Sequence, residues 1–181
     1  MIIDRKKNWK NVKKVKHSSN LYGIYLDDVC LKSDKGNDLK LPEHLADEIV
    51  LEWSDDKSVS AIKKSFFTKF SFSVADFNEN EHKSVIEGLL EYGNCDPICY
   101  IADKPRKLHV KQKKLYKPTI EWIEKFLSIK LNIGDGLLFV EQPVLNSYKI
   151  KKYLDDLNDF HLIAIYELTK SIGSLFITLA I

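Results

Sequence analysis

Apolar residues recur at helical spacing through most of the second half of the chain. Val85, Ile86, Leu89 and Leu90, for example, fall on one face of a helix. The same spacing predicts helices over the following ranges: 81–92, 106–116, 118–128, 144–157 and 160–181. The segment 129–142 between them predicts a loop or a short strand.

Proline, glycine and aspartate suggest where these helices begin and end. Pro118 is expected to open the helix over 118–128, because its missing N–H would be unpaired in the first turn anyway. Gly93 is expected in a left-handed C-cap after the helix over 81–92, since glycine has no Cβ that would clash there. Asp159 is expected as the N-cap of the last helix.

The first half of the chain begins with shorter, alternating segments. The range 21–26 predicts a strand, Asp27 and Asp28 predict a turn, and 29–31 predicts the returning strand of a hairpin. Val12 and Val15 lie in a further basic strand or an extended arm. A small antiparallel sheet is expected, because the turns follow each other closely.

Helical spacing returns after this sheet. Pro42 opens a predicted helix whose apolar residues run to Trp53. The pattern over 65–77 fits both a helix and a strand. The chain is therefore predicted to be an α+β protein, with a small N-terminal antiparallel β part and a larger C-terminal α-helical part. A polar loop near Asn78 places the expected domain boundary there, giving domains 1–78 and 79–181.

Composition adds few constraints on partners. The net charge of +2 predicts no obligatory polyanionic partner, and arginine occurs only at Arg5 and Arg106. Three cysteines without a signal peptide argue against a disulfide framework. The longest uncharged run, 171–181, is too short to span a bilayer, so we expect no membrane insertion. The polar N-terminus resembles neither a secretory signal nor a transit peptide, which favours a cytoplasmic protein.

One stretch, 92–122, contains several residues in a characteristic order and spacing. It contains Tyr92, Gly93, Asp96, Cys99, Tyr100, Pro105, Leu108, Gln112, Pro118 and Trp122. This pattern resembles the ATP-twelve family of assembly chaperones. Further short matches extend the resemblance over roughly residues 9–181, from Tyr25, Leu26 and Asp27 to the Gly-Ser-Leu that begins at Gly173.

The resemblance implies a function for the chain. It implies an ATP-independent, non-enzymatic chaperone that binds the unassembled alpha subunit of the ATP synthase catalytic head and promotes assembly of the head. It also implies a bacterial cytoplasmic protein, or a mitochondrial matrix protein in a eukaryote, that needs no cofactor and is monomeric when free. For the segment 65–77, it favours the helix. The residues expected to meet the partner are Tyr92, Asp96, Tyr100, Gln112, Trp122, Gln142 and Glu167.

The chain departs from the family pattern at three places. Asp28 stands where the family has glycine, and Tyr116 stands where it has tryptophan. The family also continues past the Gly-Ser-Leu, whereas this chain stops at Ile181, inside a predicted helix. Gln112, Gln142 and Glu167 are polar residues in apolar surroundings, and two roles stay open for them: linking loops internally or contacting a partner.

Two other functions are weaker alternatives. Cys95 and Cys99, with His82 and His109 nearby in the sequence, could centre a metal site or a small enzyme, but structural zinc sites use closer cysteine pairs. The basic runs over 5–16 and 104–117 include aromatic residues and could bind nucleic acid. No nucleophile with a base beside it and no glycine-rich phosphate loop is evident in the sequence, so a scaffold that presents a surface is favoured over an enzyme.

Overall fold

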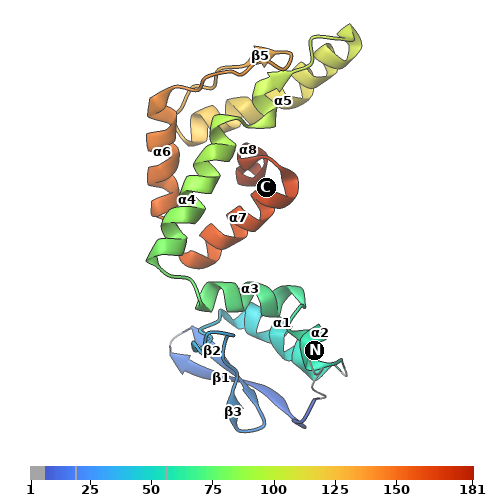
Figure 1. Cartoon of the computed structure of the whole chain (residues 1–181), viewed down its shortest axis with the longest axis vertical. Helices are drawn as coiled ribbons and strands as arrows, with labels where there is room; N and C mark the ends of the chain where they lie inside the picture. The colour runs from blue at the N-terminus through green and yellow to red at the C-terminus, as the bar shows by residue number, and fades with distance from the viewer. Residues whose placement is uncertain (1–6, 19, 56) are drawn as a thin grey trace. The chain divides into compact units, whose positions relative to one another are not determined.

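The computed structural model describes residues 7–18, 20–55 and 57–181. The chain divides into two compact units, Met1–Phe77 (unit 1) and Asn78–Ile181 (unit 2) (Figure 1). An antiparallel sheet in unit 1 and a mainly helical unit 2 confirm the α+β class. That each unit folds as an independent domain stays a prediction. Arg5 and Lys6, which begin the N-terminal basic run, lie outside the described residues.

Unit 1 pairs a small sheet with helices. Its elements are β1 (Val12–Ser18), β2 (Leu21–Leu26), β3 (Val29–Cys30), α1 (Glu43–Ser54), α2 (Val59–Ile62) and α3 (Phe66–Ala75). The strands are antiparallel in the order β1-β2-β3, and the predicted hairpin turns at Asp27, which has a positive φ of 53°. The Asp27 carboxylate accepts hydrogen bonds from the backbone N–H groups of Lys10 and Asn11, which fixes the turn.

The core of unit 1 joins the sheet to α1 and α3. Ile24, Ile49 and Trp53 are fully or almost fully buried. The Trp53 indole N–H donates to the Thr68 hydroxyl at 2.9 Å, so the buried ring has its polar atom satisfied. Of residues 65–77, whose pattern fitted two structures, Phe66–Ala75 form helix α3.

Unit 2 is built mainly from helices. Its elements are α4 (Glu79–Asn94), the 3-10 turn η1 (Pro97–Cys99), β4 (Tyr100–Ile101), α5 (Arg106–Phe126), β5 (Gly134–Asp135), α6 (Val144–Asp155), α7 (Asp159–Ile172) and α8 (Leu175–Ala180). α4 packs against α6, α7 and α8, and α8 also packs against α5. The short strands β4 and β5 pair in parallel. In the part of the chain that the structure describes, no helix has the length and apolar content needed to cross a membrane.

The prediction of separate helices over 106–116 and 118–128 was wrong. Pro118 lies inside one continuous helix, α5. An interior proline leaves the carbonyl of the residue four positions earlier without its helical N–H, here that of Lys114. Lys114 is exposed, so water can satisfy that carbonyl and the helix continues.

The roles predicted for Gly93 and Asp159 were also wrong, and so was the single helix predicted over 160–181. Gly93 lies within the last turn of α4, where a Cβ would approach Leu175 Cδ2 to 3.3 Å, so close packing is what favours glycine there. The left-handed cap occurs at Gly173, with a φ of 80°, and it divides the predicted helix over 160–181 into α7 and α8. Asn158, not Asp159, caps the start of α7.

Candidate functional site

Helix α5 is the most exposed long helix of unit 2. Among its residues, all of which the structure describes, Ile123 is the one buried side chain. Figure 1 shows the first turns of α5 extending away from the other helices of unit 2. A helix of this length that buries so little has most of its surface available to a partner.

One exposed face of α5 is apolar. Leu108, Leu115, Trp122 and Phe126 follow each other at spacings of seven, seven and four residues, which places them on one side of the helix. We call this set the α5 stripe. Between 41% and 59% of each side chain is exposed. Trp122 stacks on Phe126 with ring centroids 4.7 Å apart, and Phe126 meets the edge of Tyr153 of α6 at 5.2 Å. The aromatic end of the α5 stripe is therefore held in place, while one side stays open to solvent.

Another face of α5 is basic. The range 106–120 contains six cations and no carboxylate: Arg106, Lys107, Lys111, Lys113, Lys114 and Lys117. Lys117 forms an exposed pair with Glu121 at 3.6 Å. Within the described part of the chain, the other five cations have no ion-pair partner. Unneutralised positive charge therefore lies along the same helix as the α5 stripe.

The first half of α5 is attached to the unit through Ala102, the residue that follows β4. The Ala102 N–H donates to Gln112 Oε1 at 2.7 Å, and His109 Nδ1 lies 2.9 Å from the Ala102 carbonyl oxygen. His109 Nδ1 also lies 3.7 Å from Asp135 Oδ1 of β5. These contacts occupy the side of α5 that faces the β4–β5 pair, which leaves the α5 stripe uncovered.

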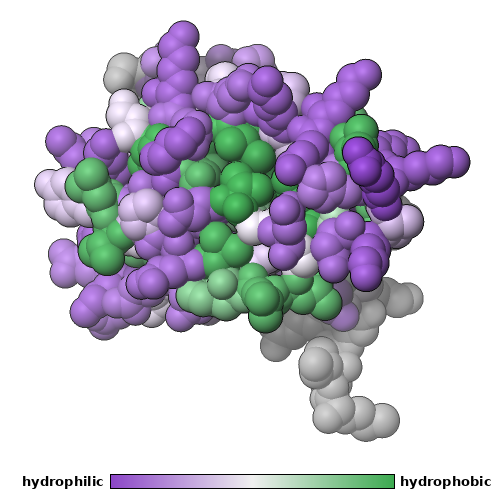
Figure 2. Space-filling model, turned by 90° about the horizontal axis from the view of Figure 1, so that it is seen from above, coloured by the Kyte–Doolittle hydropathy of each residue, from purple (hydrophilic) through white to green (hydrophobic). Residues whose placement is uncertain are grey.

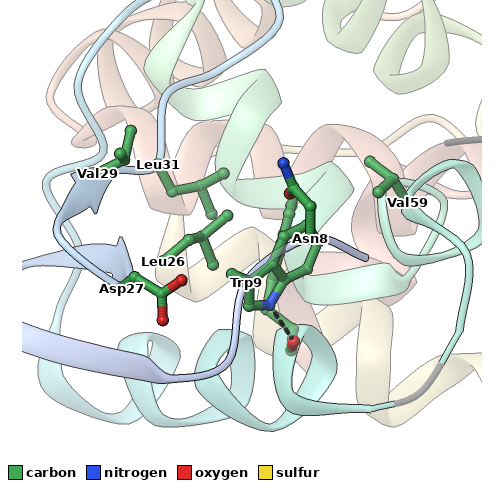
Figure 3. Close-up of a pocket in the computed structure, with 8 residues that line it drawn as sticks. Asn8, Trp9, Leu26, Asp27, Val29, Leu31 and Val59 are labelled. Carbon is green, nitrogen blue, oxygen red and sulfur yellow. Dashed lines mark hydrogen bonds between the residues drawn. The ribbon is translucent and has the colours of Figure 1, made fainter. Parts of the chain in front are cut away.

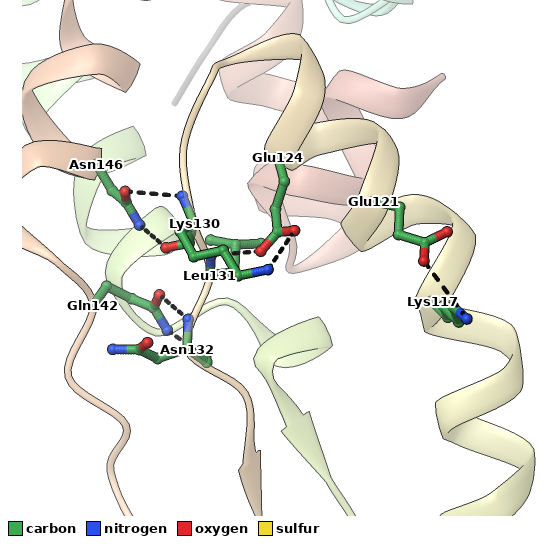
Figure 4. Close-up of polar contacts among 8 residues, drawn as sticks. All are labelled: Lys117, Glu121, Glu124, Lys130, Leu131, Asn132, Gln142 and Asn146. Carbon is green, nitrogen blue, oxygen red and sulfur yellow. Dashed lines mark hydrogen bonds and ion pairs between the residues drawn. The ribbon is translucent and has the colours of Figure 1, made fainter.

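The second half of α5 is attached through the segment that follows it. Glu124 accepts a hydrogen bond from the Leu131 N–H at 2.9 Å and pairs with Lys130 at 3.0 Å. The Asn146 side-chain amide accepts a hydrogen bond from the Lys130 N–H and donates one to the Lys130 carbonyl. The Gln142 amide makes the same pair of hydrogen bonds with the backbone of Asn132 (Figure 4). The end of α5 and the start of α6 are thus linked by side-chain amides.

Asp96 is a buried residue of unit 2 whose carboxylate connects two segments of the chain. Its carboxylate is fully buried and accepts hydrogen bonds from the Ser174 hydroxyl at 2.7 Å, the Phe176 N–H at 2.9 Å and the Ile98 N–H at 3.2 Å. Burial raises the pKa of Asp96 above its ordinary value, although these hydrogen bonds act in the opposite direction. Asp96 thereby joins η1 to the start of α8.

The structure brings only some of the sequence-predicted partner residues together. Tyr100 belongs to β4, and Gln112 bonds Ala102, the residue after β4. The Tyr100 hydroxyl accepts a hydrogen bond from the Val140 N–H at 3.3 Å. Trp122 lies on the α5 stripe. Tyr92 is half-buried in α4, and Glu167 is exposed on α7, where it pairs with Lys170 at 3.4 Å.

The two roles left open for the polar residues can now be compared. The side-chain oxygens of Gln112 and Gln142 both fix backbone segments inside unit 2. Glu167 keeps an exposed carboxylate. The two glutamines therefore link backbone segments inside unit 2, whereas Glu167 and Trp122 are accessible to a partner.

Sequence reasoning missed an exposed apolar loop. Leu137, Leu138 and Phe139 follow β5 and are 99%, 83% and 72% exposed. Their signal in the sequence was a run of four apolar residues directly after Gly136, which takes a positive φ of 84°. Figure 2 shows hydrophobic side chains exposed among hydrophilic ones on one face of the molecule.

Unit 1 contains a separate apolar pocket of about 410 Å³. It is lined mainly by Trp9, Leu26, Val29, Leu31 and Trp53 (Figure 3). The Trp9 indole N–H donates to the Trp53 carbonyl at 3.1 Å, and the two rings lie 5.2 Å apart. The pocket suits an apolar side chain. Its polar lining residues are Asn8 and Asp27, and the Asp27 carboxylate already accepts the turn's backbone hydrogen bonds.

Cys95 and Cys99 lie in different surroundings. Cys95 is exposed and Cys99 is buried. Burial, with smaller contributions from Asp96 and Glu124, raises the pKa of the Cys99 thiol to about 12, so this thiol is neutral at physiological pH. Among the described residues, no group of three or more His, Cys, Asp or Glu side chains could hold a metal ion.

Comparison with known proteins gives consistent matches. The sequence profile described as ATP12 chaperone protein matches residues 6–124. A mutant of Atp12p from P. denitrificans superimposes with a TM-score of 0.86 at 28% identity, over 97% of this chain and 75% of that one. The structure of Atp12 from Paracoccus denitrificans gives the same TM-score and coverage at 27% identity. A protein from Agrobacterium tumefaciens shares the fold, with a TM-score of 0.83 at 22% identity over 97% of this chain and 66% of that one.

Proposed function

Because the chain belongs to the ATP12 chaperone family, we propose that it binds the unassembled alpha subunit of ATP synthase and promotes assembly of the catalytic head. Binding is sufficient for this role, since a chaperone of this kind covers a surface and releases it to the next subunit. The proposal therefore requires neither ATP nor a catalytic group in this chain.

The observation that carries the proposal is the α5 stripe. A subunit that has not yet assembled exposes an apolar interface, which would otherwise promote aggregation. The α5 stripe offers four large apolar side chains that are each about half exposed. Its Trp122 is of the residue type that most often dominates the energy of a protein interface.

The size of this surface suits reversible binding. Complete burial of a large apolar side chain contributes about 1.5–3 kcal/mol. The exposed portions of four such side chains would then contribute about 3–6 kcal/mol before the costs of association are subtracted. Such a contact can shield a subunit and still yield to the larger interface of the assembled head.

The test is co-expression of this chain with the ATP synthase alpha subunit of the same organism, followed by size-exclusion chromatography. We expect the alpha subunit to remain soluble and to co-elute in a stoichiometric complex. Leu115→Asp places a charge in the middle of the α5 stripe and should abolish co-elution. Leu51→Asp is the matched control, because Leu51 is similarly exposed (65% against 59%) but lies on α1 of unit 1.

Two results would contradict parts of the proposal. If the alpha subunit aggregates with the wild-type chain as it does alone, the proposed client is wrong. If Leu115→Asp and Leu51→Asp both co-elute like the wild type, the alpha subunit is a client but the α5 stripe is not its binding surface. Circular dichroism of both variants establishes that each is folded.

A further inference from the structure

The α5 stripe has a row of lysines along one side. Lys107, Lys111 and Lys114 follow each other at spacings of four and three residues, so they occupy one strip of the helix surface. Lys111 and Leu115 are four residues apart, which makes the lysine row the direct neighbour of the α5 stripe. On its other side, the α5 stripe borders the positions that contact the unit, Gln112 and Ile123.

This arrangement restricts the chemistry of what can cover the α5 stripe. We propose that the α5 stripe and the lysine row receive an amphipathic helix whose apolar face is edged by Asp or Glu. Under the proposed function this helix is a segment of the alpha subunit, and the inference then rests on that proposal. The apolar residues supply the contact, and the lysine row fixes the direction and register of the partner helix.

The spacing of the α5 stripe favours a helix over an extended segment. Apolar residues seven positions apart are the repeat by which two helices contact each other side by side. From Leu108 to Phe126 the α5 stripe extends over about 27 Å, which is about five helical turns. A segment bound as a strand needs unpaired backbone groups at a sheet edge. Apart from the Lys114 carbonyl opposite Pro118, the interior backbone groups of α5 are hydrogen-bonded within the helix, so α5 offers no such edge.

The charge of α5 favours an acidic partner over a second copy of this chain. A symmetric pair of α5 helices would bring two helices together that each have six cations and no carboxylate over 106–120. A carboxylate-edged helix replaces this repulsion with attraction and raises the association rate.

A membrane surface suits α5 less well. A helix that lies in the bilayer interface has a broad apolar face. The α5 stripe is one row wide, between the lysine row on one side and the contacts to the unit on the other. A partner helix with a single apolar row fits this width.

The direct test uses two synthetic helical peptides and fluorescence anisotropy with the full chain. Both have leucine at heptad spacing, and one has glutamate at the flanking positions where the other has lysine. We expect the glutamate peptide to bind at least about tenfold more tightly than the lysine peptide, with an affinity that falls as salt is added. The same glutamate peptide should displace the alpha subunit from a preformed complex.

A charge exchange makes the test specific for the lysine row. The triple variant Lys107→Glu, Lys111→Glu and Lys114→Glu should reverse the preference, so that the lysine peptide binds more tightly than the glutamate peptide. A control triple variant, Lys10→Glu, Lys83→Glu and Lys152→Glu, changes the net charge equally at exposed positions elsewhere and should keep the wild-type preference.

The outcomes separate this inference from the proposed function. If the alpha subunit binds but the two peptides bind equally or not at all, the inference is wrong and the function stands. If the glutamate peptide binds and the alpha subunit does not, the α5 surface takes an acidic helix from another client. Stronger binding to phosphatidylglycerol vesicles or to a single-stranded oligonucleotide than to the glutamate peptide, or dimerisation blocked by Leu115→Asp, would also overturn the inference.

Discussion

Helices α4 and α5 belong to the same unit and use their apolar residues in opposite ways. α4 begins with a capping box, in which the Asn78 side chain accepts from the Glu81 N–H and Glu81 bonds back to the Asn78 N–H. Ile86 and Leu89 of α4 are buried against the surrounding helices. α5 begins without a side-chain cap and exposes its regularly spaced Leu108, Leu115, Trp122 and Phe126.

This difference shows that apolar periodicity alone does not identify a core. The periodicity predicts that one side of each helix is removed from water, but it does not say whether the covering surface belongs to the same chain. Charge gives a further indication. The run 106–120 has six cations and no carboxylate, and five of these cations have no ion-pair partner among the described residues. A one-sided charge beside an apolar row is typical of a surface that meets a partner.

Leu89→Ala should have the largest effect on stability. Leu89 is fully buried in α4, so the substitution removes apolar contacts and leaves a cavity. We expect the free energy of unfolding to fall by about 2–5 kcal/mol, measured by urea denaturation. A loss below about 1 kcal/mol would show that α4 is no more a core element than α5.

Asp96→Ala should come next. The substitution leaves the Phe176 N–H and the Ser174 hydroxyl without their buried acceptor. We expect a loss of about 1–3 kcal/mol in the free energy of unfolding. An unchanged urea midpoint would contradict the role of Asp96 in joining η1 to α8.

The protonation of Asp96 predicts a smaller, pH-dependent effect. Burial raises the pKa of Asp96 in the folded chain above its ordinary value of 3.8. As the pH rises through the range between these two values, the unfolded chain loses its proton first and the folded chain binds more protons. The contribution of Asp96 to the free energy of unfolding therefore decreases with rising pH.

Asp96→Asn removes this titration. We expect its urea midpoint, relative to that of the wild type, to improve as the pH is raised from about 4 towards 7. A difference between the two proteins that stays constant over this range would show that Asp96 has the same pKa in the folded and unfolded chains.

Leu115→Ala should have the smallest effect on stability. Leu115 is more than half exposed, so its truncation should change the free energy of unfolding by less than about 0.5 kcal/mol. Its complex with the alpha subunit should nevertheless weaken, which size-exclusion chromatography at decreasing concentration would detect. A loss of stability as large as that of Leu89→Ala would place Leu115 in the core.

Local signals were sufficient for much of the fold. The hairpin followed from alternation around Asp27 and Asp28, and the α+β class followed from the change to helical spacing after Pro42. The exact ends of helices depended on distant contacts. Gly93 is needed for packing against Leu175, about eighty residues later, whereas the cap is at Gly173.

The candidate site could be predicted only in part. Trp122 was selected through the family resemblance, and its exposed position on α5 agrees with a contact role that stays a prediction. The burial of Asp96 depends on Ser174 and Phe176, which are distant in the sequence. The α5 stripe was hidden by the expectation that Pro118 begins a new helix, because its residues were then divided between two elements.

Hydrogen–deuterium exchange tests the central claim most directly. The exchange of backbone amides is compared for the chain alone and for the chain with the alpha subunit. We expect the amides of α5 between Leu108 and Phe126 to exchange more slowly in the complex, while those of α1 around Leu51 stay unchanged. Unchanged exchange in α5, together with protection elsewhere in the chain, would contradict the account.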